Sequence, residues 1–521
     1  MRKLIIAFAV TGAPLAAQSF PTDNPVLRGI WEEGMTRSQV EPLLQVLLDS
    51  IGPRLTGSPS QRAGHDWAVG MYTRWGVPAR NEQYGTWRGW RRGVTHVDLI
   101  APRVRSLEAT MLAWSPGTNR GRPVEGAVML LPDLPDSAAY AQWMRGVRGA
   151  FVAISFPEPT CRPRDNWERW SSAETADRVF AARQAAAAAW SSPPQRTGRV
   201  ERTGYNLAGL VGALEAAGVV GILTSRWSLG WGVNKVFGAQ AQRVPQLDVS
   251  CEDYGLIARL AERNQGPRIR VAAEAEFTDA APTFNTIAMI RGSELPDEYI
   301  VLSAHFDSWD GGSGATDNGT GTIVMMEAMR ILRQMYPNPR RTILVGHWSG
   351  EEQGLNGSRA FAHDHPEVVQ GLQALFNQDN GTGEVASISM GGLLAAGGHF
   401  GRWFSMIPRA LTADIDFNIP GTPAGGGSDH ASFACAGAPA FGLGSASWDY
   451  GTYTWHTNRD TFDKVNLDNV RRNAVLTAML GYLASEDPTM IARDRAVLPT
   501  NQQGNQMQWP TCRDGARTAP Q

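Results

Sequence analysis

The sequence predicts an α/β protein with a mixed, largely parallel sheet that is covered by helices and carries an inserted β-rich domain. Apolar runs at Tyr299–Ala304, Thr342–Gly346 and Ala374–Phe376 resemble buried strands. Gly321–Met335 and Leu467–Leu483 have apolar residues at helical spacing. Strands and helices in such an order are typical of parallel sheets with both faces covered.

The first residues resemble a signal peptide. Positively charged Met1–Lys3 precedes the short apolar stretch Leu4–Val10, and small residues lead to an expected cut near Ala17. The apolar stretch is too short for a membrane about 30 Å thick, and no later segment supplies the ~20 apolar residues that a span needs. We therefore expect a secreted or periplasmic protein with a signal peptide over residues 1–17 and no stable membrane insertion.

The length of 521 residues favours more than one domain. The next helix is expected to begin at the capping-box pattern Thr36–Gln39 and to run through Leu48. After the signal peptide we divide the chain into four parts. Residues 18–116 form the N-terminal part of the main domain, and residues 117–278 form an inserted domain. Residues 279–490 form the rest of the main domain, and residues 491–521 form a C-terminal tail.

The inserted region differs in character from the rest. Valine-rich strand candidates occur at Gly126–Leu131, Val219–Thr224 and Val244–Ser250, and a helix is expected near Asp253–Arg263. The stretch 162–203 has no assigned purpose.

Composition excludes some partners and leaves other questions open. The net charge is -2, and no basic run is interleaved with aromatic residues, so nucleic acid is not an expected partner. Four cysteines are compatible with an oxidising compartment and allow three pairings. Cys435 lies in the apolar run Phe433–Ala436, and we interpret it as a buried thiol.

Acids and histidines follow the strand-like runs, where glycine-rich loops begin. These residues are His305, Asp307, Asp317, Glu351, Glu352, Asp379 and His456. In open α/β sheets the carboxyl ends of the strands meet at the binding site, so these side chains are expected to converge. Any one of them could serve as a loop cap, but the set as a whole has the imidazole and carboxylate groups that zinc prefers.

Two zinc ions about 3.5–4 Å apart need a carboxylate that bridges them. Asp317 is the candidate bridge, because the glycines around it let the backbone fold tightly. His305 and Asp379 would complete one zinc site, and Glu352 and His456 the other. Asp307 would hold the His305 ligand geometry. Glu351 remains free to act as general base.

Five segments carry a family resemblance. They are His305–Asp310, Ala315–Gly319, Ser349–Gly354, Asn377–Asp379 and His456–Thr461. In this order and spacing they resemble the M28 family of zinc peptidases, and Ile51–Ser58 looks most like the carboxypeptidase Q-type branch. The resemblance implies a zinc exopeptidase fold with two zinc ions per chain, the ligand set above and Glu351 as the base. It also implies that the insert is similar to a protease-associated domain.

The implied activity is that of an aminopeptidase or dipeptidase, in which a zinc-bridged hydroxide attacks a peptide carbonyl. One departure is Trp455, where some relatives place a tyrosine that stabilises the tetrahedral intermediate; Tyr450 and Tyr453 are candidates to replace it. Ser428–His430 resembles a segment near the substrate pocket. The alternatives are a glutaminyl-peptide cyclase-like enzyme and an inactive peptide-binding protein. We expect a peptide as the partner and leave open whether the chain forms a homodimer.

Overall fold

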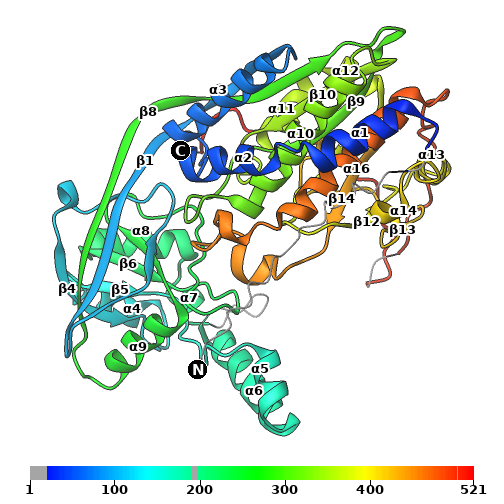
Figure 1. Cartoon of the computed structure of the whole chain (residues 1–521). Coiled ribbons are helices and arrows are strands. Elements are labelled where there is room, and N and C mark those ends of the chain that lie inside the picture. The colour runs from blue at the N-terminus through cyan, green and yellow to red at the C-terminus, as the bar shows by residue number, and fades with distance from the viewer. Residues whose placement is uncertain (1–19, 21, 191–197, 501–502, 521) are drawn as a thin grey trace, which may run out of the picture.

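The computed structural model describes residues 20, 22–190, 198–500 and 503–520. The predicted signal peptide, residues 1–17, lies outside these ranges. A single 14-stranded sheet passes through the described part of the chain and is flanked by helices (Figure 1). The mixed α/β class predicted from the sequence is confirmed.

The strands run in the order β13-β12-β14-β11-β9-β10-β8-β4-β5-β6-β7-β3, and β1 pairs with β8 and β2 beside this path. Their bounds are β1 Ala79–Ala101, β2 Arg105–Ser106, β3 Ala109–Met111, β4 Val124–Leu130, β5 Phe151–Ala153, β6 Gly221–Thr224, β7 Gln246–Val249, β8 Arg268–Ile290, β9 Leu295–His305, β10 Arg341–Trp348, β11 Leu372–Asn377, β12 Val385–Ser389, β13 Asp416–Asn418 and β14 Ala440–Ser445.

The helices lie on both faces of this sheet. Their bounds are α1 Pro25–Thr36, α2 Val40–Gln45, α3 Pro59–Arg74, α4 Ser137–Met144, α5 Arg164–Trp170, α6 Ala173–Trp190, α7 Arg199–Arg202, α8 Leu207–Ala217, α9 Cys251–Glu262, α10 Thr320–Met335, α11 Asn356–Asp364, α12 Pro366–Gln370, α13 Ala396–Phe404, α14 Arg409–Thr412, α15 Ala431–Ala434 and α16 Leu467–Glu486. Among the described residues, no helix has the length and apolar character needed to cross a membrane.

The centre of the sheet is buried on both sides. Strands β9, β10, β11 and β14 are parallel neighbours. In β9, Ile300 and Leu302 pack into the cluster that contains α10 and α16, whereas Val301 faces the cluster of Phe361 and Phe433. Alternate residues therefore serve two apolar layers, which explains why these strands appear as continuous apolar runs in the sequence.

Strands β1 and β8 join this centre to the inserted region. They pair antiparallel from Ala79 with Ala288 to Ala101 with Arg268. One end of β8 pairs with β10 and the other with β4. Figure 1 shows the two strands running together from the part with α10 and α16 to the part with α4, α8 and α9. The insert therefore continues the main sheet.

Within the insert, β4, β5, β6 and β7 form a small parallel sheet, and β3 pairs antiparallel with β7. Helices α4 and α8 supply one apolar cluster and α9 contributes to another. Helices α5 and α6 lie in the stretch without an assigned purpose and project from the body (Figure 1). A disulfide between Cys161 and Cys251 ties the start of this projection to α9.

Two local predictions were wrong. The helix expected from Thr36 through Leu48 begins later, at Val40 of α2, because Thr36 is the last residue of α1, which Asn24 caps by accepting hydrogen bonds from Val26 and Leu27. Cys435 is not a free thiol: it forms a disulfide with Cys512, which brings the C-terminal tail back to the end of α15.

Candidate metal centre

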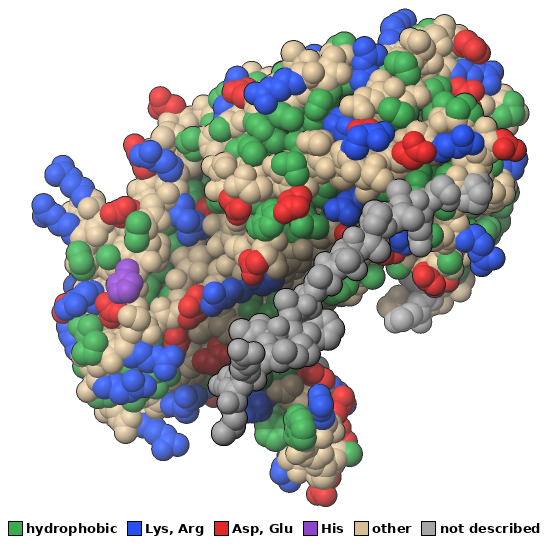
Figure 2. Space-filling view, in the orientation of Figure 1, with side chains coloured by type: hydrophobic (Ala, Val, Ile, Leu, Met, Phe, Trp, Pro, Cys, Tyr) green, Lys and Arg blue, Asp and Glu red, His purple; other side chains and the backbone are tan. Residues whose placement is uncertain are grey.

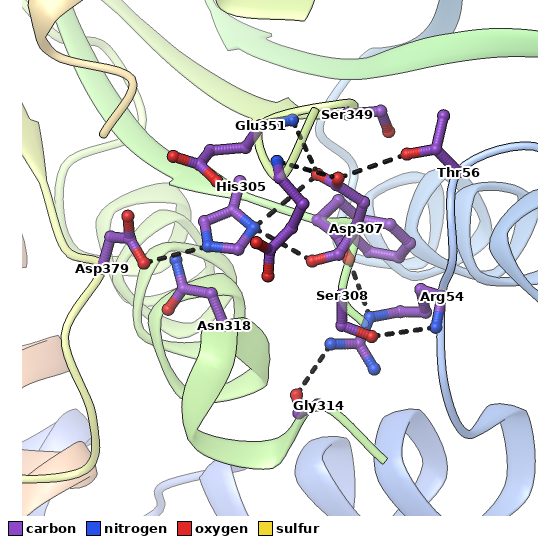
Figure 3. Close-up of polar contacts among 12 residues, drawn as sticks. Arg54, Thr56, His305, Asp307, Ser308, Gly314, Asn318, Ser349, Glu351 and Asp379 are labelled. Atoms are coloured by element: carbon purple, nitrogen blue, oxygen red, sulfur yellow. Dashed lines mark hydrogen bonds and ion pairs between the residues drawn. The ribbon is translucent and has the colours of Figure 1, made fainter. Parts of the chain in front are cut away.

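The predicted ligands come from the carboxyl ends of the central strands. His305 is the last residue of β9, Asp379 follows β11 by two residues, and Glu351 and Glu352 lie in the loop after β10. Asp317 lies in the turn between β9 and α10, and its peptide bond to Asn318 is cis. Figure 3 shows His305, Asp307, Glu351 and Asp379 gathered at this edge.

The side chains form two groups that share one member. His305 Nε2 lies 2.9 Å from Asp379 Oδ1 and 3.3 Å from Asp317 Oδ1. His456 Nε2 lies 2.9 Å from Glu352 Oε2 and 3.2 Å from Asp317 Oδ2. Each oxygen of Asp317 therefore faces a different imidazole, which is the arrangement that a bridging carboxylate requires.

Each group suits a metal ion. In His305–Asp317–Asp379 and in Asp317–Glu352–His456, one potential ligand atom from every residue lies within 4.8 Å of the others. Buried Glu352 Oε1 accepts no hydrogen bond from any described residue. An unsatisfied buried oxygen is costly unless a cation or proton compensates it. Two carboxylates and one imidazole in each group fit zinc.

Asp307 supports the centre in two ways. Its carbonyl oxygen accepts a hydrogen bond from His305 Nδ1 at 3.0 Å, so Nε2 is left facing the acids. Its carboxylate accepts the backbone N–H groups of Glu351 and Glu352 at 3.2 and 3.3 Å, and the Thr56 hydroxyl at 3.2 Å (Figure 3). The imidazole proton therefore goes to the carbonyl, while the carboxylate fixes the glutamate loop.

Arg54 holds the loop between the first ligands. Its guanidinium is fully buried and donates to the carbonyl oxygens of Gly52, Phe306, Ser313 and Gly314 at 2.8–2.9 Å. Phe306 directly precedes Asp307, and Ser313 and Gly314 lie shortly before Asp317. Burial lowers the pKa of Arg54 to about 10, although nearby Asp460, Asp307 and Asp317 oppose that shift, so the group stays charged at neutral pH.

The buried charges shift one another's pKa. Burial raises the pKa of Glu351 well above its usual range; His305 opposes this shift, and neighbouring carboxylates reinforce it. Burial and the charge of Asp317 raise the pKa of Glu352 to about 7. For His456, burial favours the neutral form, but Glu352 and Asp317 outweigh it and raise the pKa to about 9. Without metal, protons on the imidazoles compensate the carboxylates.

The inserted region holds the loop of His456. The backbone of His456 is left-handed, with φ 59°, a conformation that residues other than glycine rarely adopt. Its carbonyl accepts a hydrogen bond from Val236 N at 2.8 Å, and the Phe237 ring packs edge-on against the imidazole at 4.9 Å. Lys235 Nζ donates to Trp455 O at 2.7 Å and lies over the Trp455 ring. One ligand loop therefore depends on the insert.

The structure adds residues that the sequence reasoning did not single out. Arg54 could have been found, because it lies in the conspicuous segment Ile51–Ser58. Asp460 accepts the backbone N–H groups of Thr316 and Asp317, and it lies in one of the family-like segments. Lys235 had no signal in the sequence, since neither periodicity nor a motif marks its surroundings.

Comparisons with known proteins agree with this geometry. Residues 285–481 match the model of peptidase family M28. The chain is 22% identical to carboxypeptidase Q from Mus musculus over 455 residues, 86% of each protein. It superposes on the crystal structure of a peptidase M28 precursor from Shewanella amazonensis SB2B with a TM-score of 0.64, at 22% identity over 90% of this chain and 97% of that one.

A second solved structure has the same fold. BSAP, a zinc aminopeptidase from Bacillus subtilis, gives a TM-score of 0.53 at 16% identity and covers 85% of this chain and 93% of its own. The family match spans the strands that carry the predicted ligands from His305 to His456. Residues 285–481 are therefore similar to peptidase family M28, and the chain shares the fold of these two solved structures.

Proposed function

We propose that the chain is a zinc-dependent exopeptidase that hydrolyses peptide bonds with Glu351 as its general base. The observation that supports this most strongly is Asp317, whose two oxygens face His305 and His456 at 3.3 and 3.2 Å. His305, Asp317 and Asp379 would hold one zinc ion, and Asp317, Glu352 and His456 the other. Bound zinc would supply Lewis acidity, which lowers the pKa of water and polarises a carbonyl.

Glu351 lies outside these two groups, although its carboxylate also lies within 4.8 Å of potential ligand atoms of His305 and Glu352. Its raised pKa, caused first by burial, brings the carboxyl nearer to the working range of a general base. It can take a proton from the attacking water and pass it to the leaving amine. Asp307 fixes the loop through the Glu351 and Glu352 N–H groups, so the two adjacent glutamates keep different directions.

A pocket of about 760 Å³ beside the centre suits part of a peptide. Thr316, Gly381, Tyr450 and Tyr453 line it next to the ligand loops. Burial and the neighbouring acids raise the pKa of Tyr450 well above its usual value, so its hydroxyl stays protonated. We propose that Tyr450 donates the hydrogen bond to the developing oxyanion, in place of the tyrosine that Trp455 replaces.

The remaining expectations are part of this proposal. Two disulfides, Cys161–Cys251 and Cys435–Cys512, support export to an oxidising compartment. The contact between the insert and His456 supports a role for the insert at the active site, as expected for a protease-associated domain.

The test combines metal content with hydrolysis of dipeptides and of peptides blocked at either end. We expect two zinc ions per chain, and a fall of about 10²–10⁴-fold in kcat for Glu351→Gln with zinc retained. Exposed Glu32→Gln is the matched control and should remain fully active. If the Glu351→Gln variant loses zinc, Glu351 is a zinc ligand and not only the general base. One zinc ion per chain together with glutaminyl cyclisation would favour the cyclase alternative. A protein that binds no zinc and hydrolyses no peptide would favour the inactive binding protein.

A further inference from the structure

A second pocket, of about 630 Å³, opens where β1, the insert, the loop of Glu351 and Glu352 and the C-terminal tail meet. Segments far apart in the sequence form its walls, which include Trp87 and Arg88, Trp114, Gly238, Gln353, and Ala516 and Ala519 of the tail. Ligand pockets commonly have about 300–1,000 Å³, so this one has room for a residue of a peptide. It shares no lining residue with the pocket of Tyr450.

Three polar side-chain atoms are buried at this pocket without a hydrogen-bond partner in the described chain. They are Nε1 of Trp114 and both Nε2 and Oε1 of Gln353. Trp114 is only 6% exposed, so water does not easily replace the missing partner. Buried donors and acceptors are normally paired, because an unpaired one is costly. These three atoms therefore offer two N–H donors and one acceptor to a ligand.

Trp114 is held in a strained conformation at the pocket wall. Its φ is 56°, in the left-handed region that a bulky side chain rarely adopts. The neighbouring residue Ala113 pairs with the insert, because Ala113 N donates to Phe237 O at 3.0 Å and Ala239 N donates to Ala113 O at 2.8 Å. The guanidinium of Arg88 lies over the Trp114 ring at 5.8 Å. Such strain persists only where the surrounding structure enforces it, and it is frequent at ligand sites.

The C-terminal tail is fixed as one wall of the pocket. Thr86 N in β1 donates to Arg517 O at 2.8 Å. Ala516 N donates to Asn356 Oδ1 at 2.8 Å, in the first turn of α11. The Cys435–Cys512 disulfide anchors the chain a few residues earlier. The wall is therefore in place before any ligand arrives.

Two connections place the pocket close to the metal centre. Gln353 directly follows Glu352 in the chain. The Trp114 ring packs against Trp309 at 5.8 Å, and Trp309 packs against His456 at 5.9 Å. An extended peptide advances about 3.3–3.6 Å per residue, so these two steps correspond to about three residues of a bound peptide.

The chemistry of the pocket suits an aromatic residue in an extended peptide. The N–H and C=O groups of one extended residue point to the same side, and the planar amide of Gln353 offers an acceptor and a donor to match them. Trp114 Nε1 supplies a further donor for a carbonyl oxygen. The indoles of Trp87 and Trp114 are apolar walls against which an aromatic ring packs favourably.

We propose that this pocket is a subsite for an aromatic residue of the substrate that lies beyond the cleaved bond. The inference rests on the proposed peptidase function and adds selection at a residue outside the cleaved pair. Lys or Arg and Asp or Glu side chains are interspersed on the face of the molecule shown in Figure 2. Overall peptide charge is therefore a weak basis for selection on that face, and local contacts such as this pocket discriminate between peptides.

The first test uses N-acetylphenylalanine N-methylamide, which is blocked at both ends and therefore reports binding without hydrolysis. Its affinity is compared with that of N-acetylalanine N-methylamide by calorimetry. We expect the aromatic probe to bind about tenfold more tightly to the wild-type protein. Gln353→Met removes the amide, and Ala516→Trp fills the pocket from an exposed position of the tail. Both should abolish the preference, whereas exposed Gln142→Met should keep it.

The second test measures hydrolysis of tetra-alanine and of its four variants with a single phenylalanine. We expect phenylalanine at a position outside the cleaved pair to lower KM about tenfold with little change in kcat. Gln353→Met should lose this gain while retaining zinc, and Trp114→Phe, which keeps a ring without the Nε1 donor, should lose part of it.

The two tests fail in different ways. Equal affinity of the wild type for both probes, or an unchanged preference in Gln353→Met and Ala516→Trp, would overturn the pocket. A KM that ignores phenylalanine outside the cleaved pair would overturn its role as a subsite. If no peptide is hydrolysed, the proposed peptidase function fails, while the blocked probes still decide whether the pocket binds an aromatic residue.

Discussion

The two halves of the metal centre are built differently. In the His305–Asp379 half, His305 is the last residue of β9 and Asp379 follows β11 by two residues, and the predicted ligand His305 is only 1% exposed. In the Glu352–His456 half, both ligands lie in loops, and His456 has a left-handed backbone that Val236 holds. The central sheet and the adjoining loop that Arg54 holds position the first half, whereas the second half also contacts the inserted region.

The difference shows how one half of a site can be held rigidly by the core while the other half responds to the position of the insert. The first half is surrounded by β9, β11 and α10, so it changes only if the core changes. The second half is joined to the insert through residues 234–237, and β5, β6 and β7 of the insert lie at the far end of the sheet from β9 and β11. A displacement of the insert would therefore act on His456 before it acted on His305.

The largest effect should come from Arg54, which holds the loop that leads to Asp317, the residue shared by both halves. Arg54→Met leaves the carbonyl oxygens of Gly52, Phe306, Ser313 and Gly314 without a donor. Buried unsatisfied groups cost about 1–3 kcal/mol each, so we expect a loss of about 4 kcal/mol or more in the free energy of unfolding, and zinc lost from both halves. Urea unfolding and zinc analysis measure this, with exposed Arg103→Met as the control. A loss below about 1 kcal/mol would show that Arg54 is dispensable.

The next effect concerns pH and the insert. Burial raises the pKa of Asp248 to about 7, although N–H groups of Arg226 and Lys235 oppose this. The unfolded value is about 3.9, so between pH 4 and 7 the folded state binds more protons, and stability falls as pH rises by up to about 1.4 kcal/mol per unit. Asp248→Asn should flatten this decline in metal-free protein.

The comparison for Asp248→Asn is unfolding by urea at several pH values between 4 and 7. Exposed Asp279→Asn serves as the control and should follow the wild-type pH dependence. If Asp248→Asn and the wild type lose stability in parallel across this range, the carboxyl of Asp248 does not titrate differently in the folded state.

The smallest effect should separate the two halves. Lys235→Met removes the 2.7 Å hydrogen bond to Trp455 O, next to His456. Loss of such an outer contact typically costs 10–100-fold in metal affinity, and we expect about tenfold at the Glu352–His456 half alone. Stepwise competition with a chelator resolves the two zinc ions, and exposed Lys464→Met is the control. Equal weakening of both ions would contradict the division into halves.

Much of the central sheet could be predicted because its strands are buried on both faces. Continuous apolar runs mark β9, β10 and β11, and the polar residues at their ends are the predicted ligands. The contact of Lys235 with the His456 loop could not be predicted, since it depends on two segments 220 residues apart that share no pattern. The pairing of four cysteines was likewise undetermined, because spacing alone allows three pairings.

One helix boundary was misplaced for a local reason. Thr36–Gln39 has the side chains of a capping box, but Asn24 and Pro25 earlier in the chain already begin a helix that ends at Thr36. A helix follows each segment, because α1 begins at Pro25 and α2 begins at Val40 once α1 has ended. The Thr36 hydroxyl instead donates to the Glu32 carbonyl inside α1.

The paired strands β1 and β8 have a consequence for how this architecture can change. Each has 23 residues and would reach roughly 75 Å if straight at about 3.3 Å per residue. They enter the insert as a continuous hydrogen-bonded ribbon with no linker between the two parts. Excising residues 117–278 would cut β8 and leave the matching edge of β1 without its partner. The insert and the central sheet are therefore one continuous hydrogen-bonded structure, and a change in the path of β1 and β8 would move one against the other.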